Sequence, residues 1–204
     1  VQKRFLSGEL SVAQVEAHNA RGQFADINSE WPWKFRLLEA QILVWQGRNK
    51  DVLALLSEAL PTPLAKGDLA IQRDLNQAMA GARLGQLDLS ARALADAERL
   101  NNENSSTLCA ELESTHGVLD LQQGDLHQAE SRFRKGLELA KRQGNRFWEA
   151  SILLNLGVVS LEADHYDEAL YWSHAASEVA RTINAQVILE KSLGNEGWDY
   201  YKLG

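Results

Sequence analysis

Hydrophobic and polar positions alternate with helical spacing along most of the chain. In residues 148–163 (WEASILLNLGVVSLEA) and 167–182 (DEALYWSHAASEVART), apolar residues return every three or four positions, which places them on one face of an α-helix. Asp167 and Glu168 open the second segment, where carboxylates suit the positive end of the helix dipole. The two segments therefore predict a pair of helices joined by a short turn.

This helical pair recurs at a nearly constant interval. Its turn falls on a glycine in every copy but one, which has Asp164 instead. The series is Gly8, Gly47, Gly85, Gly124, Asp164 and Gly204, and the intervals between neighbours are 39, 38, 39, 40 and 40. Glycine adopts left-handed backbone conformations without a Cβ penalty, and aspartate tolerates turns. We therefore expect each of these residues to end the first helix of a pair.

Small residues recur on both sides of the turn. Seven positions before it stand Ala40, Ala78, Gly117, Gly157 and Gly197, and twelve positions after it stand Ala20, Ala59, Ala97, Gly136 and Ala176. Small side chains at these points would let the two helices of a pair approach closely. The segment Trp31-Pro32-Trp33 is expected to open one first helix, with proline in the first turn, and Pro61 and Pro63 to close the following second helix.

These repeats predict an all-α fold. Alanine and leucine dominate the composition, which favours helix over strand. Four complete repeats are expected at 33–70, 71–109, 110–149 and 150–189, flanked by half repeats at 1–32 and 190–204. The chain does not begin with methionine and both ends cut through a helical pair, so we interpret it as an excised piece of a longer protein.

The repeat resembles the tetratricopeptide repeat (TPR) family. Leu153, Leu156-Gly157, Tyr166 and Ala169 match the family pattern, although its usual tryptophan is missing. The period near 39 exceeds the usual family period of about 34 and is similar to the extended TPRs of kinesin light chains and CHAT proteases. HEAT and armadillo repeats, with periods of about 40 to 47, are the structural alternative. The resemblance implies one α-α superhelix whose first helices line a concave groove.

The resemblance also implies that a peptide or protein segment binds in this groove. One inner-face position reads Leu38, Asn76, Thr115, Asn155 and Asn195 in successive repeats. An asparagine amide can donate to and accept from a peptide unit, so a ladder broken at Leu38 and Thr115 is expected to hold an extended backbone, unless these residues cap or brace helices. The predicted groove residues are Asn76, Asn155, Asn195, Leu75, Met79, Arg83, Leu154, Val158 and Trp198.

Charge and candidate chemistry narrow the function. The net charge of -7 argues against nucleic acid as the main partner, and no apolar run is long enough to cross a bilayer. The basic cluster Arg132, Arg134, Lys135, Lys141, Arg142 and Arg146 is expected on a solvated outer surface, and groove lysines are too scattered for a carboxylate clamp. Cys109 is interpreted as a small buried residue rather than a nucleophile paired with His116. No metal or cofactor is predicted.

We therefore expect a non-catalytic protein-interaction scaffold, with self-association through open solenoid ends as a further possibility. The alternative is a regulatory segment of a larger protein such as a CHAT-type protease, with catalytic residues outside this chain. A sensor region of a transcription regulator has no helix-turn-helix here to support it. The lone cysteine and the missing leader make the cytoplasm the default location.

Overall fold

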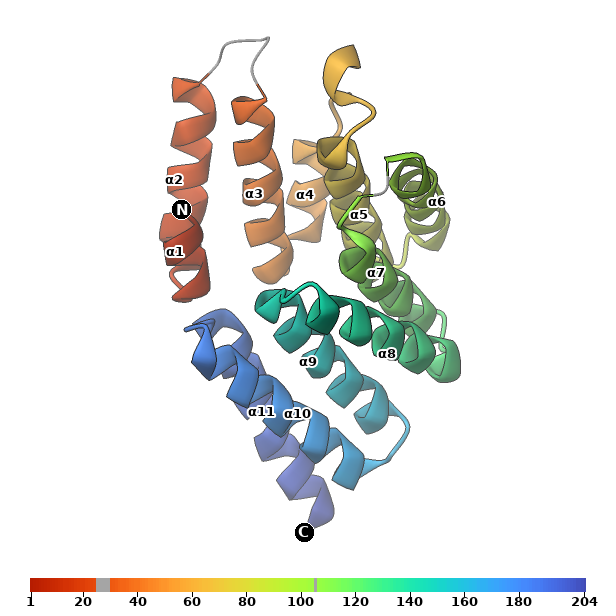
Figure 1. Ribbon diagram of the computed structural model, residues 1–204. Helices are drawn as coiled ribbons and strands as arrows, with labels where there is room; N and C mark the ends of the chain where they lie inside the picture. Colours follow the sequence, from red (N-terminus) through yellow and green to blue (C-terminus); the bar gives the residue numbers. More distant parts are fainter. Residues whose placement is uncertain (25–29, 105) are drawn as a thin grey trace. The chain divides into compact units, whose positions relative to one another are not determined.

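The computed structural model describes residues 1–24, 30–104 and 106–204. In these residues all regular secondary structure is helical, which confirms the predicted all-α class (Figure 1). The helices are α1 (Gln2–Leu6), α2 (Leu10–Gln23), α3 (Trp31–Trp45), α4 (Asn49–Leu55), the 3₁₀ helix η1 (Thr62–Leu64), α5 (Asp68–Arg83), α6 (Leu87–Asn104), α7 (Cys109–Gln122), α8 (Leu126–Arg142), α9 (Arg146–Glu162), α10 (Tyr166–Thr182) and α11 (Gln186–Leu203).

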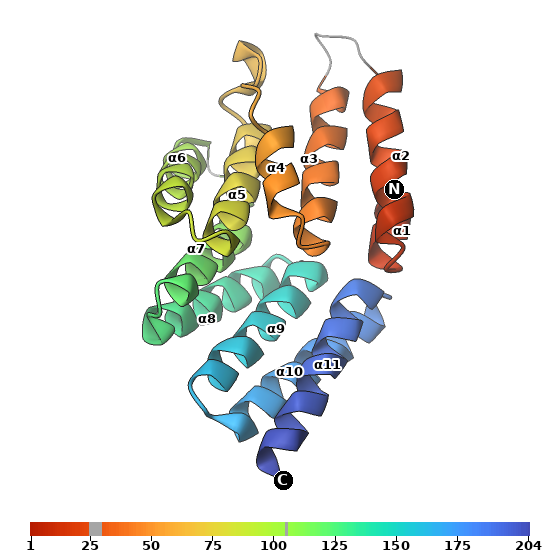
Figure 2. The ribbon, with the colours of Figure 1, turned by 180° about the vertical axis from the view of Figure 1, so that it is seen from behind.

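The chain divides into two compact units. Unit 1 holds Val1–Phe5 and Glu9–Leu108, and unit 2 holds Leu6–Gly8 and Cys109–Gly204. In unit 1, α3 packs against α2, α4 and α5, and α5 packs against α6. In unit 2, α8 packs against α7 and α9, while α10 packs against α9 and α11, as Figure 2 shows from behind. First and second helices thus alternate as the repeat predicts, whereas their union in one continuous solenoid stays a prediction.

The turn residues have the left-handed conformation that their spacing predicts. Backbone φ is 72° to 81° at Gly47, Gly85 and Gly124 and 59° at Asp164. After α9, the amide of Asp164 donates to the carbonyl of Leu161 at 3.1 Å and that of His165 to Ser160 at 2.8 Å. This is the double hydrogen bond of a Schellman cap. The turn therefore satisfies the last carbonyls of the first helix before the second helix begins.

A second series of left-handed turns, not predicted from the sequence, follows the second helices. Gly144 after α8 has a φ of 65°, and Asn184 after α10 has a φ of 53°. These residues stand one repeat apart, so both connections of the repeat keep the same period. The next first helices begin at once, and the Asn145 side chain caps α9 by accepting from the Trp148 amide at 3.3 Å.

The small residues of the repeat bring helices close where a second helix follows. A Cβ added at Gly117 would lie 2.8 Å from the ring of Phe133 in α8, and one at Gly157 would lie 2.9 Å from the Ser173 hydroxyl in α10. At Gly197 in α11 an added Cβ would meet nothing within 4 Å. The expected close approach thus holds at Gly117 and Gly157, and the same position of α11 is open.

The first complete repeat departs from the predicted pattern. Pro61 and Pro63 were expected to close its second helix, but α4 ends at Leu55 and Ala59 is exposed rather than packed. The Leu56 carbonyl at this end accepts from Arg73 Nη2 at 3.2 Å and Gln77 Nε2 at 2.9 Å, both from α5. Side chains of α5 therefore provide the hydrogen bonds for a carbonyl at the early end of α4.

Candidate functional site

The predicted asparagine position carries unbonded side-chain amides in unit 2. Asn155 lies in α9 and Asn195 in α11, and these two first helices contact each other. Both side chains are half-buried, and neither amide forms a hydrogen bond with another described residue. The two amides do not brace or cap a helix within the described part of the chain. Their donors and acceptors remain available on the first helices α9 and α11.

Apolar side chains flank the two asparagines to different degrees. Leu154 is only 7% exposed, so it forms part of the core beneath α9 more than a surface contact. Val158 is half-buried, and Trp198 is 49% exposed. The indole of Trp198 lies 5.4 Å from the ring of Tyr201 in a tilted arrangement. Val158 and Trp198 are therefore the predicted apolar groove residues that a partner can contact.

The predicted groove residues of unit 1 serve mainly to hold their own unit. Asn76 donates from Nδ2 to the Gln72 carbonyl of the same helix at 2.8 Å. Leu75 and Met79 are 5% and 8% exposed, which places them in the core. Arg83 donates from Nη1 to the Val44 carbonyl at 3.0 Å, near the end of α3. Asn76 therefore braces its own helix, which is the alternative to peptide contact. Asn155 and Asn195 do not.

The two breaks in the asparagine series differ in structure. Thr115 is 2% exposed, and its hydroxyl donates to the Glu111 carbonyl in the preceding turn at 2.9 Å. Leu38 is half-buried in α3. A buried threonine that is bonded to its own helix cannot contact a peptide, so in unit 2 the available ladder has two members, on α9 and α11.

Unit 1 also contains a cavity that the sequence did not predict. It has a volume of about 610 Å³ and lies at the start of α3 and α5, beside η1. Lys34 in its wall is held by Glu30, with Nζ 2.6 Å from Oε1. The lining residues are Glu30, Lys34, Pro63, Leu64, Gly67, Asp68, Leu69 and Gln72. The only hint in the sequence is that Lys34 and Gln72 stand one repeat apart.

Apart from Lys141, the members of the basic cluster on α8 and at the start of α9 are paired with acids. Arg134 contacts Glu130 at 2.6 Å and Glu168 at 3.1 Å. Arg132 and Lys135 both contact the carboxylate of Glu113 in α7, at 3.1 and 2.5 Å. These pairs neutralise the positive charge within the unit and leave little for a phosphate backbone.

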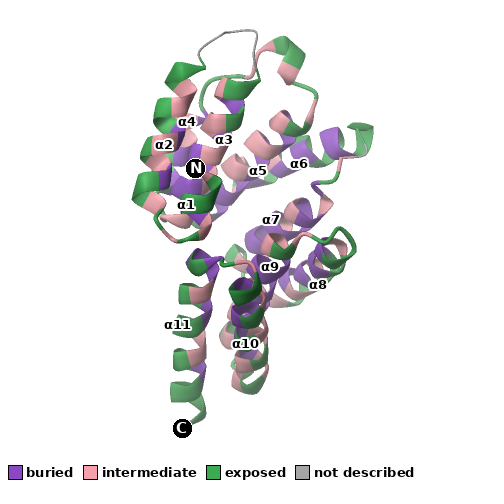
Figure 3. Ribbon diagram, turned by 60° about the vertical axis from the view of Figure 1, so that its left-hand side comes forward, coloured by how far each residue is buried: buried purple, intermediate pink, exposed green. Residues whose placement is uncertain are grey.

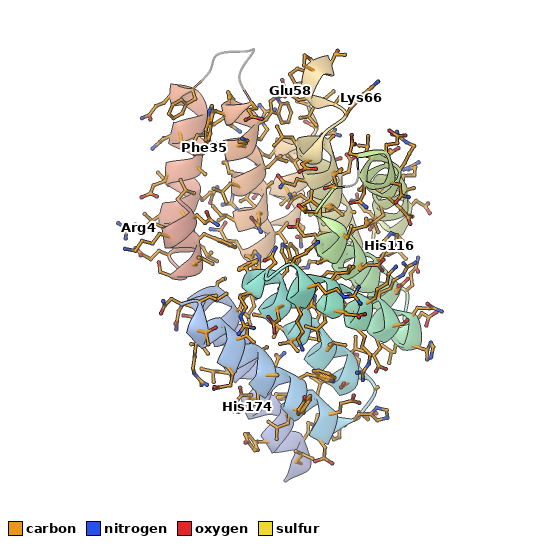
Figure 4. The ribbon with its side chains drawn as sticks, viewed as in Figure 1. Arg4, Phe35, Glu58, Lys66, His116 and His174 are labelled. Atoms are coloured by element: carbon orange, nitrogen blue, oxygen red, sulfur yellow. The ribbon has the colours of Figure 1, made fainter. Side chains whose placement is uncertain are left out.

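The cysteine and histidine of α7 do not stand out as a reactive pair. Cys109 is half-buried at the first residue of α7, so the expectation that it is buried was wrong. A position at the helix start leaves its side chain less covered than a mid-helix residue. His116 lies seven residues later in the same helix (Figure 4). Over the described part of the chain, no cluster of three or more His, Cys, Asp or Glu residues is arranged to hold a metal.

Two packed first helices, each followed by a second helix with the same left-handed turn, define the repeat of unit 2. Residues 106–182, which contain α7 to α10, match the family model described as tetratricopeptide repeat. This segment is a tetratricopeptide repeat region. Its left-handed turns at Gly124 and Asp164 stand 40 residues apart, and the assignment to the extended type of TPR stays a prediction.

Similarity to a solved structure extends the TPR-like fold beyond that segment. BtubC (BKLC) from P. vanneervenii has a TM-score of 0.65 to this chain, covering 98% of this chain and 83% of that one. The sequences are 20% identical, so the likeness shows the fold alone. A search of the curated proteins gave no match. Among the helices described, none is both long and apolar enough to span a membrane.

Proposed function

We propose that this chain is a non-catalytic scaffold that binds an extended peptide segment on the inner face of unit 2. The TPR match supports the general part, because this family typically mediates protein–protein interaction without catalysis. The observation that carries the specific part is the pair of unbonded, half-buried amides of Asn155 and Asn195 on neighbouring first helices.

The geometry of this pair suits an extended backbone. Packed helices lie about 8–10 Å apart, and an extended chain advances about 3.3 Å per residue. Asn155 and Asn195 can therefore meet peptide groups about three residues apart. Each amide offers a donor and an acceptor, which match the C=O and N–H of a peptide unit. Val158 and Trp198 then supply apolar contacts beside the backbone.

Panning a random peptide library against the chain tests this proposal. An enriched peptide is expected to bind the wild type and to lose at least tenfold in affinity to the double variant Asn155→Ala/Asn195→Ala, about 1.4 kcal/mol. Asn102→Ala, at an exposed position of α6, is the matched control and should bind like the wild type. Circular dichroism checks that helicity is unchanged.

Two results would refute the asparagine contacts. One is the absence of any enriched peptide, which would move the function to a segment serving its own chain. The other is equal binding to the wild type and to the double asparagine variant, which would place the peptide elsewhere.

We also propose weak self-association through the open side of α11. Leu193 and Tyr200 are 43% and 61% exposed, while Leu153 and Ser160, one repeat earlier in α9, are 4% and 5% exposed. Exposed apolar faces of this kind favour association. Light scattering should show a mass that rises with concentration and falls back in Tyr200→Ser. A monomer mass at all concentrations would exclude this association.

A further inference from the structure

Two lysines, an asparagine and a tryptophan line one face of α11. Lys191, Asn195, Trp198 and Lys202 follow at spacings of four, three and four residues, which keeps them on one side of a helix. Both lysines and Trp198 are exposed, and Asn195 is half-buried. Figure 3 shows the exposed positions that recur along this helix. We name this set the α11 stripe.

The ammonium groups of the α11 stripe have no acidic partner among the described residues. Lys191 forms no ion pair with any of them. Lys202 lies near aromatic rings instead, with Nζ 5.4 Å from the centre of the Tyr166 ring and 5.5 Å from that of Trp198. By contrast, Arg134 of the same unit is paired with two carboxylates. The stripe is thus a local positive surface on a chain with a net charge of -7.

Of the acidic groups on and near α11, two are engaged within unit 2 and three form no ion pair with a described residue. Glu196 lies 3.8 Å from Nδ1 of His174 in α10. Asp199 is fully buried and accepts a hydrogen bond from the Ser173 hydroxyl at 3.0 Å. Glu162, Asp167 and Glu190 are exposed and form no ion pair with a described residue. These three carboxylates disfavour an acidic group beside them, so the attraction for acidic groups is confined to the stripe.

We propose that the α11 stripe selects acidic peptide segments. A backbone held at Asn195 passes between the two lysines, which lie about 6 and 10 Å away along the helix axis at a rise of about 1.5 Å per residue. An Asp or Glu side chain of the partner pairs with Lys191 or Lys202, and an apolar side chain packs on Trp198. This inference rests on the proposed peptide binding and adds the charge of the partner.

The test compares charge at the stripe with charge elsewhere on the chain. A fluorescein-labelled peptide from the panning experiment is titrated by anisotropy against the wild type and Lys191→Glu/Lys202→Glu. Its counterpart, with every Asp and Glu replaced by Asn and Gln, is titrated in parallel. The control Lys50→Glu/Lys141→Glu reverses two exposed lysines outside the stripe, which likewise form no ion pair with a described residue, and gives the same net charge.

We expect the enriched peptides to be rich in Asp and Glu. The stripe variant should weaken their binding at least tenfold, and the control less than twofold. The amide counterpart should bind weakly to every variant, and salt should reduce the binding of the acidic peptide to the wild type. If the stripe variant loses helicity, Lys191→Gln/Lys202→Gln replaces it, with an expected loss of at least threefold.

The failing outcomes separate the two proposals. Neutral or basic consensus peptides that still depend on Asn155 and Asn195 would overturn the acidic selectivity and leave the peptide site standing. Equal losses in the stripe variant and the control would attribute the effect to net charge and also overturn it. The absence of any enriched peptide would refute both proposals.

Discussion

Gly117 and Gly197 occupy the same position of the repeat, yet alanine should have opposite effects at the two sites. At Gly117, the added Cβ would lie 2.8, 2.9 and 2.9 Å from three ring atoms of Phe133. That ring is fully buried, so it cannot swing away. At Gly197, the added Cβ would meet nothing within 4 Å. Both glycines are helical.

Two effects of known size set the expected magnitudes. Alanine favours a helix interior over glycine by about 1 kcal/mol. Overpacking a well-filled core costs about 1–3 kcal/mol. Gly197→Ala should therefore raise the free energy of unfolding by about 0.5–1 kcal/mol. Gly117→Ala carries both effects, and should lower it by about 1 kcal/mol on balance.

Urea unfolding followed by circular dichroism at 222 nm measures both changes. Thermal midpoints should move by about 2–4 °C per kcal/mol in a chain of this size. The variant Phe133→Leu should relieve the clash, so a double-mutant cycle with Gly117→Ala should show favourable coupling. Equal stabilisation by both alanine substitutions would refute the reasoning, because it would mean that α7 and α8 leave room for a Cβ at Gly117.

Three further substitutions at buried charges, with one exposed control, are tested by urea unfolding. Burial raises the pKa of Asp74 from 3.8 to about 6, so the folded state binds this proton more tightly than the unfolded state. The resulting stabilisation of the fold is complete below pH 3.8 and is lost as the pH rises to about 6. The free energy of unfolding falls by at most about 3 kcal/mol over this range. Asp74→Asn should flatten this dependence on pH, and an unchanged dependence would contradict the role of Asp74. Asp199 occupies the position that Val159 holds one repeat earlier, and burial raises its pKa. Asp199→Val should stabilise unit 2 by about 1 kcal/mol at pH 7, and destabilisation would show that the hydrogen bond to its serine partner dominates. Glu113→Gln should cost about 1–3 kcal/mol because two cations lose a buried carboxylate, whereas Glu130→Gln, an exposed pair, should cost under about 0.5 kcal/mol.

Sequence reasoning located the candidate site only in part. The asparagine period pointed to Asn76, Asn155 and Asn195 alike, because a repeat position does not reveal which amides find partners. In the structure, Asn76 bonds its own helix, and the other two do not bond with any described residue. Burial likewise separates Leu154 from Trp198, although the sequence predicts both on the inner face. The groove lysines are too scattered along the sequence to predict a clamp, and only the structure shows that Lys191 and Lys202 form no ion pair with a described residue.

The sequence by itself determined most of the helices, the turn between the two helices of each pair and the repeat. Glycine or aspartate at the same point of every repeat sets a left-handed turn, and this is a local property of the backbone. The early end of α4, the tight contact at Gly117 and the open one at Gly197 were decided by tertiary structure. The end of a helix and the space around a glycine depend on which side chains of other helices pack against that position. The period of a sequence determines where a surface recurs, and packing decides whether that surface is filled or available to a partner.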